Sequence, residues 1–317
     1  MVRNCKPLHR MSLSRRSSLL ALVLLPVGLL LHAQAAHAES VTISPPKEEL
    51  FGNAGDTITE KIKVSNDSPT DITYQVQVDN FTAEGDKGGV NLIDDKNAPL
   101  TNISLASWVT TEPSRFTANI NSPAIVSYTI KIPKGAEPGG KYASVIIKRA
   151  GQAVQGGDAV DTRVGSLILL RVSGDVTEKL SLDAFKTDNN YYQKGPVSFS
   201  LRTTNTGNVH VAPQGRIVIT DTFGHKVDEI ALSQANVLPT SSRVVQTTWG
   251  NSKLIGRYTA TLVATYGQQN ETLSATTSFI VMPIWLVIVL LALLLTIVLL
   301  ITQRRGIKRI INRLTSD

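Results

Sequence analysis

The chain has 317 residues, of which 42% are hydrophobic, and a formal charge of +7. The positive excess lies at the two ends: five of the 32 Lys and Arg residues precede position 17, five follow position 303, and residues 39–281 carry 22 basic and 24 acidic residues, a charge of about −2. Nucleic-acid binding needs basic residues gathered on one surface, and this central part contains no basic run, so nucleic acid is excluded as a partner.

Residues 1–38 have the features of a secretory signal. Several basic residues come first, and an apolar stretch from position 19 to position 31 follows. Ala36-His37-Ala38 supplies a small-x-small cleavage pattern, so we expect a mature chain that starts at Glu39. The only cysteine, Cys5, lies in this segment, so the exported part has no disulfide framework and must rely on ordinary hydrophobic cores.

Residues 39–174 show short runs in which apolar and polar residues alternate. Ile58, Ile62 and Val64 share one such pattern, and similar runs occur at 72–78 and 126–132. A period of two predicts half-buried antiparallel strands, so we expect a β-sandwich here. The sandwich would carry two longer insertions, a polar loop at 80–99 and a hairpin tip at 151–161.

The same alternation continues over residues 175–281, with runs at 197–201 and 258–264 and the turn sequence Asn205-Thr206-Gly207-Asn208. No amphipathic helical stretch interrupts it, which indicates a second sandwich of the immunoglobulin-like type. Ser173-Gly174-Asp175 is the expected hinge. The predicted fold class is therefore an all-β ectodomain with two tandem immunoglobulin-like β-sandwich domains, followed by one transmembrane α-helix.

Residues 282–302 are predicted to be that helix, because the eighteen residues from Ile284 to Ile301 carry no charge and can cross a hydrocarbon core of about 30 Å. Trp285 is expected at the outer interface. A basic tail, residues 303–317, should stay in the cytoplasm through its cations, which are Arg304, Arg305, Lys308, Arg309 and Arg313. The sequence thus predicts a single-pass plasma-membrane protein with an extracellular N-terminal part and the lipid bilayer as one partner.

Two groups of residues are candidates for binding. Trp108 and Trp249 could each stack on a sugar or anchor a protein partner, although core packing is the plainer explanation. Asp86, Asp94 and Asp95 lie in the predicted polar loop and could contact a partner or supply oxygen ligands to a weak calcium site. A solvated loop is the plainer explanation for these acids, and no metal site is predicted.

Catalytic motifs are missing from the sequence. His210 and His225 are the histidines of the exported part, and both stand beside turn residues without a second His or a Cys at metal-ligand spacing. We therefore expect them to lie at the surface or to stabilise turns. No Gly-x-Ser-x-Gly sequence is present. These observations predict a protein that is not an enzyme and that uses no cofactor.

Longer segments resemble a known family. The first domain contains GDTITEKIKVSNDSPTDITYQVQV and YTIKIPKGAEPGGKYASVIIK, and the second contains TTNTGNVHVAPQGRIVITDTFGHKV. With the secretion signal, the single membrane helix and the basic tail, this order resembles the bacterial WxL-interacting proteins and related surface proteins. The resemblance implies a first domain that engages peptidoglycan and a second that engages a protein partner.

The sequence favours a non-catalytic, membrane-anchored binding, adhesion or scaffold protein of a bacterial surface, whose partner is a cell-wall polymer or a surface protein. An alternative is a membrane-anchored assembly chaperone, which would receive another chain on an exposed strand edge. A carbohydrate-acting enzyme is a further alternative, and it would require a cleft with two facing carboxylates.

Overall fold

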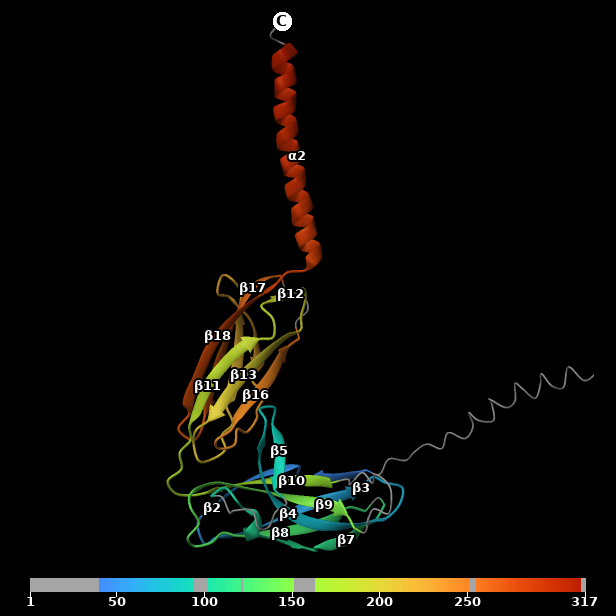
Figure 1. Ribbon diagram of the computed structural model, residues 1–317, viewed down its shortest axis with the longest axis vertical. Coiled ribbons are helices and arrows are strands. Elements are labelled where there is room, and N and C mark those ends of the chain that lie inside the picture. Colours follow the sequence, from blue (N-terminus) through green and yellow to red (C-terminus); the bar gives the residue numbers. More distant parts are fainter. Residues whose placement is uncertain (1–39, 94–101, 121, 151–162, 251–254, 315–317) are drawn as a thin grey trace, which may run out of the picture.

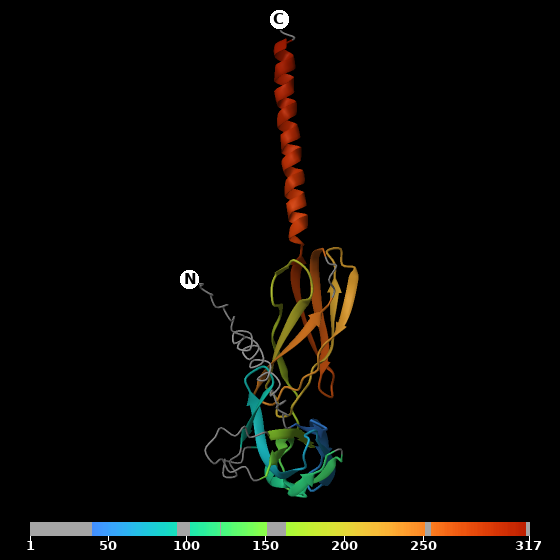
Figure 2. The ribbon, with the colours of Figure 1, turned by 90° about the vertical axis from the view of Figure 1, so that its right-hand side faces the viewer.

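A computed structural model describes residues 40–93, 102–120, 122–150, 163–250 and 255–314, with side chains described as far as Gln303. The predicted signal, the predicted hairpin tip at 151–161, and Asp94 and Asp95 lie outside these ranges. The molecule is elongated. One β-sandwich lies at the far end from a long C-terminal helix, and a second sandwich lies between the two, in both views (Figure 1, Figure 2).

The first domain consists of two facing sheets. Its smaller sheet has the order β1-β3-β8-β6, and its larger sheet has the order β2-β10-β9-β4-β5, with β7 paired to the start of β4. The strands are β1 (Val41–Ser44), β2 (Lys47–Gly52), β3 (Thr57–Asn66), β4 (Ile72–Glu84), β5 (Gly89–Ile93), β6 (Val109–Glu112), β7 (Arg115–Ala118), β8 (Ala124–Lys131), β9 (Gly139–Arg149) and β10 (Arg163–Val172).

Alternation along the strands builds the core of this domain as the sequence predicts. On β3, Ile62 and Val64 are fully buried while Lys61 and Lys63 face solvent. The predicted polar loop at 80–99 is partly wrong, because β4 continues to Glu84 and pairs with β5. The sequence of this hairpin is mostly polar because one of its faces is solvated beyond the core, so the apolar pattern of a strand is weak there.

The second domain also consists of two sheets, ordered β11-β13-β16 and β12-β18-β17-β14-β15. Residues 232–241, between β15 and β16, form no strand, so β16 lies at an edge of the three-stranded sheet. The strands are β11 (Leu180–Thr187), β12 (Tyr191–Tyr192), β13 (Val197–Asn205), β14 (Gln214–Thr220), β15 (Lys226–Ala231), β16 (Ser242–Trp249), β17 (Gly256–Tyr266) and β18 (Glu271–Val281).

The two domains have separate hydrophobic cores, one built from residues between Ile43 and Val172 and the other from residues between Leu180 and Val281. The predicted hinge, Ser173-Gly174-Asp175, falls between them. The fold is thus all-β with two β-sandwiches, as the sequence predicts.

The same asparagine corner ends a strand in each domain. Asn66 at the end of β3 donates its amide to the carbonyls of Thr70 and Ala118, at 2.7 and 2.9 Å. Asn205 at the end of β13 donates in the same way to Val209 and Val237, at 2.7 and 2.8 Å. Both amides are buried, and each satisfies two carbonyls that the turn leaves without strand partners.

The chain ends in α2 (Ile284–Leu314), which continues directly from the last strand of the second domain (Figure 2). Residues Ile284–Gln303 are long and apolar enough to cross a membrane, with a mean hydropathy of 3.4 and no part of this stretch buried by the rest of the chain.

Candidate functional site

The two sandwiches meet on the outer face of the larger sheet of the first domain. Tyr142 on β9, Phe81 on β4 and Leu169 on β10 form a small buried cluster there, apart from both cores. Leu238, from the strandless segment before β16, packs against it from the second domain. The domains therefore share an apolar seam in addition to their linker.

His210 crosses this seam from the second domain. Its backbone N–H donates to the Oη atom of Tyr142 at 2.9 Å, and its Nδ1 lies 3.2 Å from the same oxygen. Burial lowers the pKa of His210 to about 4, although the negative charge of Glu49 partly opposes that shift. The expectation of a surface or turn-stabilising role is wrong for His210, since only 9% of the residue is exposed.

His225 does stabilise a turn. Its backbone N–H donates to Oδ1 of Asp221 at 2.9 Å, and its ring lies 3.3 Å from the other oxygen of that carboxylate. These bonds occur in the exposed turn between β14 and β15, so His225 confirms the prediction that His210 contradicts.

The turn between β4 and β5 makes a second contact between the domains. The carbonyl of Asp86 accepts a hydrogen bond from the backbone N–H of Val244 at 2.6 Å. The Asp86 carboxylate forms an ion pair with Arg202 on β13 at 2.5 Å. Asp86 was a candidate for partner or calcium binding, but its carboxylate is engaged by the second domain. No group of three or more potential metal ligands occurs among the residues that the structure describes.

A third contact spans the linker. Arg171 at the end of β10 pairs with Glu178, just before β11, and both side chains are largely buried. The other oxygen of Glu178 accepts the N–H of Gln268 at 2.7 Å. This carboxylate therefore holds the linker against the β17–β18 turn of the second domain.

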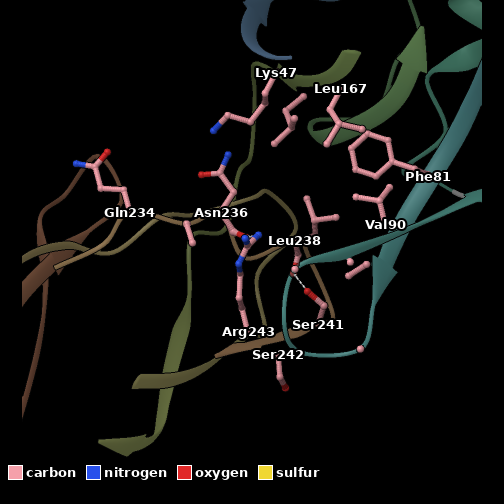
Figure 3. A pocket seen from close by; sticks show the side chains of 16 residues that line it. Lys47, Phe81, Val90, Leu167, Gln234, Asn236, Leu238, Ser241, Ser242 and Arg243 are labelled. Carbon is pink, nitrogen blue, oxygen red and sulfur yellow. Dashed lines mark hydrogen bonds between the residues drawn. The ribbon is translucent and has the colours of Figure 1, made fainter. Parts of the chain in front are cut away.

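A pocket of about 220 Å³ opens beside the apolar seam, between the two domains (Figure 3). Its apolar part comes from Phe81, Val90 and Leu167 of the first domain and Leu238 of the second. The β4–β5 turn closes one side, and the segment from Gln234 to Arg243 closes the other. This volume is below the range of about 300–1,000 Å³ that is typical of drug-sized ligands, so it suits one side chain or a chain end of a partner.

Two cations stand at the mouth of this pocket. Lys47 pairs with Glu49 at 2.6 Å. Arg243 donates to the carbonyl of Asn236 at 2.9 Å, and no carboxylate of the described residues lies within salt-bridge distance of it. Burial would raise the pKa of Glu49, but the hydrogen bonds from Lys47 and Asn236 outweigh it and lower that pKa. Arg243 is thus the pocket cation whose charge no described carboxylate neutralises, and it keeps donors for an anionic or carbonyl-bearing ligand.

The two candidate tryptophans lie in different environments. Trp249 at the end of β16 is 1% exposed, packs on Tyr258 and Phe279, and donates its Nε1–H to Asp228 at 2.7 Å. Core packing, the plainer explanation, therefore describes Trp249. Trp108 is half-buried in the short 3-10 helix Ala106–Trp108 and lines a shallow polar hollow with Asn102, Glu137 and Lys141.

Trp285 lies in the first turn of α2 and is exposed, and its place at the outer membrane interface stays a prediction. The cations predicted to follow the membrane span, Arg304, Arg305, Lys308, Arg309 and Arg313, lie in the last part of this helix, where side chains are not described.

Sequence reasoning did not find the pocket. Its residues come from both domains and from a strandless segment, so no local motif marks them. The sequence carries one signal, the apolar run Val145-Ile146-Ile147, which does not alternate and is typical of a strand covered on both faces. In the structure, the first nine residues of β9 are buried.

No protein-family model matches the chain, and no curated protein matches its sequence. Similar solved structures include the class 5 fimbriae chaperone CfaA, with 13% identity and a TM-score of 0.39 over 76% of this chain and 99% of that one. The CupB2 chaperone of Pseudomonas aeruginosa has 8% identity and a TM-score of 0.36, and the match covers 75% of this chain and 100% of that one. The complex of the Salmonella enterica SafA pilin with the SafB chaperone has 13% identity and a TM-score of 0.34, and the match covers 78% of this chain and 99% of that one. Similarity at this level carries no conclusion about function.

Proposed function

We propose that this chain is a membrane-anchored assembly chaperone of a bacterial surface, which binds a segment of another exported protein in the pocket between its two domains. The observation that carries the proposal is the pocket itself, in which an apolar wall from both domains stands beside Arg243, a cation without an acidic partner among the described residues.

The arrangement suits binding rather than chemistry. The contacts that Tyr142, Asp86 and Arg171 make with the second domain hold the two walls of the pocket at a defined distance, which lowers the entropy cost of capturing a partner. An apolar side chain of the partner would fill the space near Phe81 and Leu238, and a carboxylate or carbonyl would meet Arg243. The apolar helix α2 would keep many copies at the membrane, so a weak site could suffice.

The orientation follows the charge at the end of the chain. Five cations after the apolar span favour a cytoplasmic tail, which places both sandwiches outside the plasma membrane. The pocket would then face proteins that have left the cytoplasm and have not yet assembled.

A cell-wall polymer is a second candidate partner. Trp108 lines a polar hollow of about 430 Å³ with Asn102, Ser104 and Glu137, and an aromatic ring beside polar groups can hold a sugar. This candidate agrees with the resemblance to WxL-interacting proteins, which implies a wall-binding first domain.

Photo-crosslinking in living cells tests the proposal. Full-length protein would carry a photoreactive residue at Ala235, in the pocket, or at Thr276, an exposed position on β18 away from it. We expect a discrete adduct with one exported protein from position 235 and none from position 276. No protein adduct from position 235, or the same adduct from both positions, would overturn the proposal. Sedimentation with peptidoglycan that is lost on Trp108→Ala would support the second candidate instead.

A further inference from the structure

The edge strand β16 of the second domain has backbone groups that its own sheet does not use. The segment before it contacts β16 through a side chain, since the N–H of Ser233 donates to the Thr247 hydroxyl at 3.3 Å. The backbone N–H of Val244 on β16 donates to Asp86 and not to β13, which shows that Val244 directs its backbone groups away from its sheet. Direction alternates along a strand, so Gln246 and Thr248 also direct their N–H and C=O groups outward. Both residues are exposed, and β16 has β13 as its sole strand neighbour in the described part of the chain.

The neighbouring pairs agree with this assignment. The N–H of Asn205 donates to the carbonyl of Ser241, so Ser241 and the alternate residues after it face β13. The carbonyl of Ser198, opposite Thr248, accepts from Asp188 on the far side of β13. Thr248 therefore has no backbone bond to β13 that a change at its nitrogen would break.

The other edge strands in the described ranges are protected against pairing. The eight-residue strand β11 contains a register shift between Leu182 and Ala184 and carries Asp183 and Lys186. The remaining edges have six residues or fewer, and the longer ones, β2 and β15, are rich in charge. Charges, bulges and short length are the usual means of blocking strand addition. From Val244 to Trp249, β16 has none of these features.

This edge already serves as an interface at its start. The β4–β5 turn of the first domain occupies Val244 through the Asp86 carbonyl, and the same turn forms one side of the pocket. A segment that leaves the pocket past this turn would meet the outward groups of Gln246 and then Thr248.

We propose that β16 takes up an extended strand of the partner protein by backbone pairing at Gln246 and Thr248. The inference rests on the proposed function and names the second half of its binding site. The pocket would receive a side chain or chain end, and β16 would bind the adjoining backbone independently of most of its sequence.

A second copy of this chain does not fit as the occupant. The strands of the second domain run along the long axis of the molecule, as α2 does (Figure 1, Figure 2). Antiparallel pairing of β16 with its counterpart would point the two helices in opposite directions, which is incompatible with one shared membrane. The occupant is therefore a segment of a different protein.

The side chains beside the edge indicate which strand fits. Val245 and Thr247 turn toward the interior of the sandwich and are buried, whereas Gln246 and Thr248 face solvent without charge. An added strand would continue these two faces, with apolar residues alternating with uncharged polar ones.

The test uses a fluorescein-labelled peptide, three Thr-Val repeats between two lysines, and the full chain in lipid nanodiscs. Thr248→Pro removes the outward N–H and leaves the bonds to β13, whereas Thr248→Val alters the side chain and keeps the N–H. We expect the peptide to bind the parent and Thr248→Val equally, and Thr248→Pro at least ten-fold more weakly. A peptide whose backbone nitrogens are methylated along one edge should bind the parent more weakly to a similar extent. An unchanged circular dichroism spectrum would show that the proline variant folds.

Equal binding by Thr248→Pro and the parent, or no binding by the parent, would overturn the strand-pairing inference. Neither result would affect the proposed function if Ala235 still crosslinked to an exported protein. Loss of that adduct, with peptide binding at β16 retained, would instead remove the pocket from the account.

Discussion

The phenol oxygen of Tyr142 in the first domain accepts the backbone N–H of His210 in the second at 2.9 Å, inside a buried seam. Tyr142 thus satisfies a donor that would otherwise be buried without a partner. The position of the pocket depends on this contact, because Tyr142 belongs to the same apolar cluster as the pocket residues Phe81 and Leu169.

Replacing this phenol should loosen the contact between the domains. Tyr142→Phe leaves the His210 N–H without its acceptor, at a cost of about 1–3 kcal/mol in the free energy of unfolding. Urea denaturation would measure the loss, and small-angle scattering would report any change in the angle between the domains. Tyr191→Phe is the matched control, because the Tyr191 hydroxyl bonds to Met282 at the exposed end of the second domain. An equal effect of the two variants would contradict the role given to Tyr142.

Acid should destabilise the same seam through His210. Its pKa is about 4 in the folded protein and about 6.5 in an unfolded chain, so between these values the unfolded state binds more protons. The contribution of neutral His210 to the free energy of unfolding is therefore fully present above about pH 6.5. It decreases as the pH drops toward 4, by up to about 3 kcal/mol. Urea denaturation at pH 7 and pH 5 would show the loss.

His210→Gln should flatten this pH dependence, whereas His225→Gln, which changes an exposed histidine, should preserve it. Parallel pH profiles for the parent and His210→Gln would show that other groups cause the acid sensitivity.

The asparagine corners should contribute more to the stability of the fold than residues in turns usually do. Asn205→Ala removes the donors to two carbonyls, at Val209 and Val237, and the acceptor for the N–H of Gly207. We expect a loss of about 3 kcal/mol in the free energy of unfolding, since each buried group left unpaired costs about 1–3 kcal/mol. Thr206→Ala, at an exposed position in the same turn, is the control, and a similar loss there would contradict the assignment.

Membrane attachment should depend on the apolar surface of α2. Leu291→Arg places a charge near the middle of the predicted span, at a cost of about 2.5–3.5 kcal/mol on insertion scales. We expect this variant to shift toward the carbonate-soluble fraction of cell membranes. Leu291→Ile should remain with the pellet, and retention of a protein that ends before Pro283 would show that another part of the chain holds it there.

The sequence predicted the elements of this fold and little of its site. Alternation at Ile62 and Val64 identified a strand directly, because one face of that strand is solvated and the other is buried. The turn sequence at Asn205 predicted the end of a strand, and the structure adds the buried hydrogen bonds of this residue and of Asn66. The role of His210 was not predictable in this way, since a residue beside a turn is usually exposed and only the packing of the second domain on Tyr142 buries it.

The pocket could not be predicted from the sequence for a related reason. Arg243 and Phe81 are far apart in the sequence, and the periodicity of a strand describes its own two faces but not which other domain covers them. Asp86 illustrates the same limit: in the sequence it is one acid of a polar stretch, and its partner Arg202 lies on a strand more than a hundred residues later.

The central claim is that a partner enters the pocket between the domains, and filling that pocket tests it most directly. Ala235→Trp adds an indole at a half-exposed lining position without removing a described hydrogen bond or ion pair of the contact. Titration calorimetry with the exported protein that crosslinks to position 235 would compare this variant with Thr276→Trp, a change on a distant face. We predict at least a ten-fold weaker Kd for Ala235→Trp and no change for Thr276→Trp. Equal affinity of both variants and the parent would contradict the account.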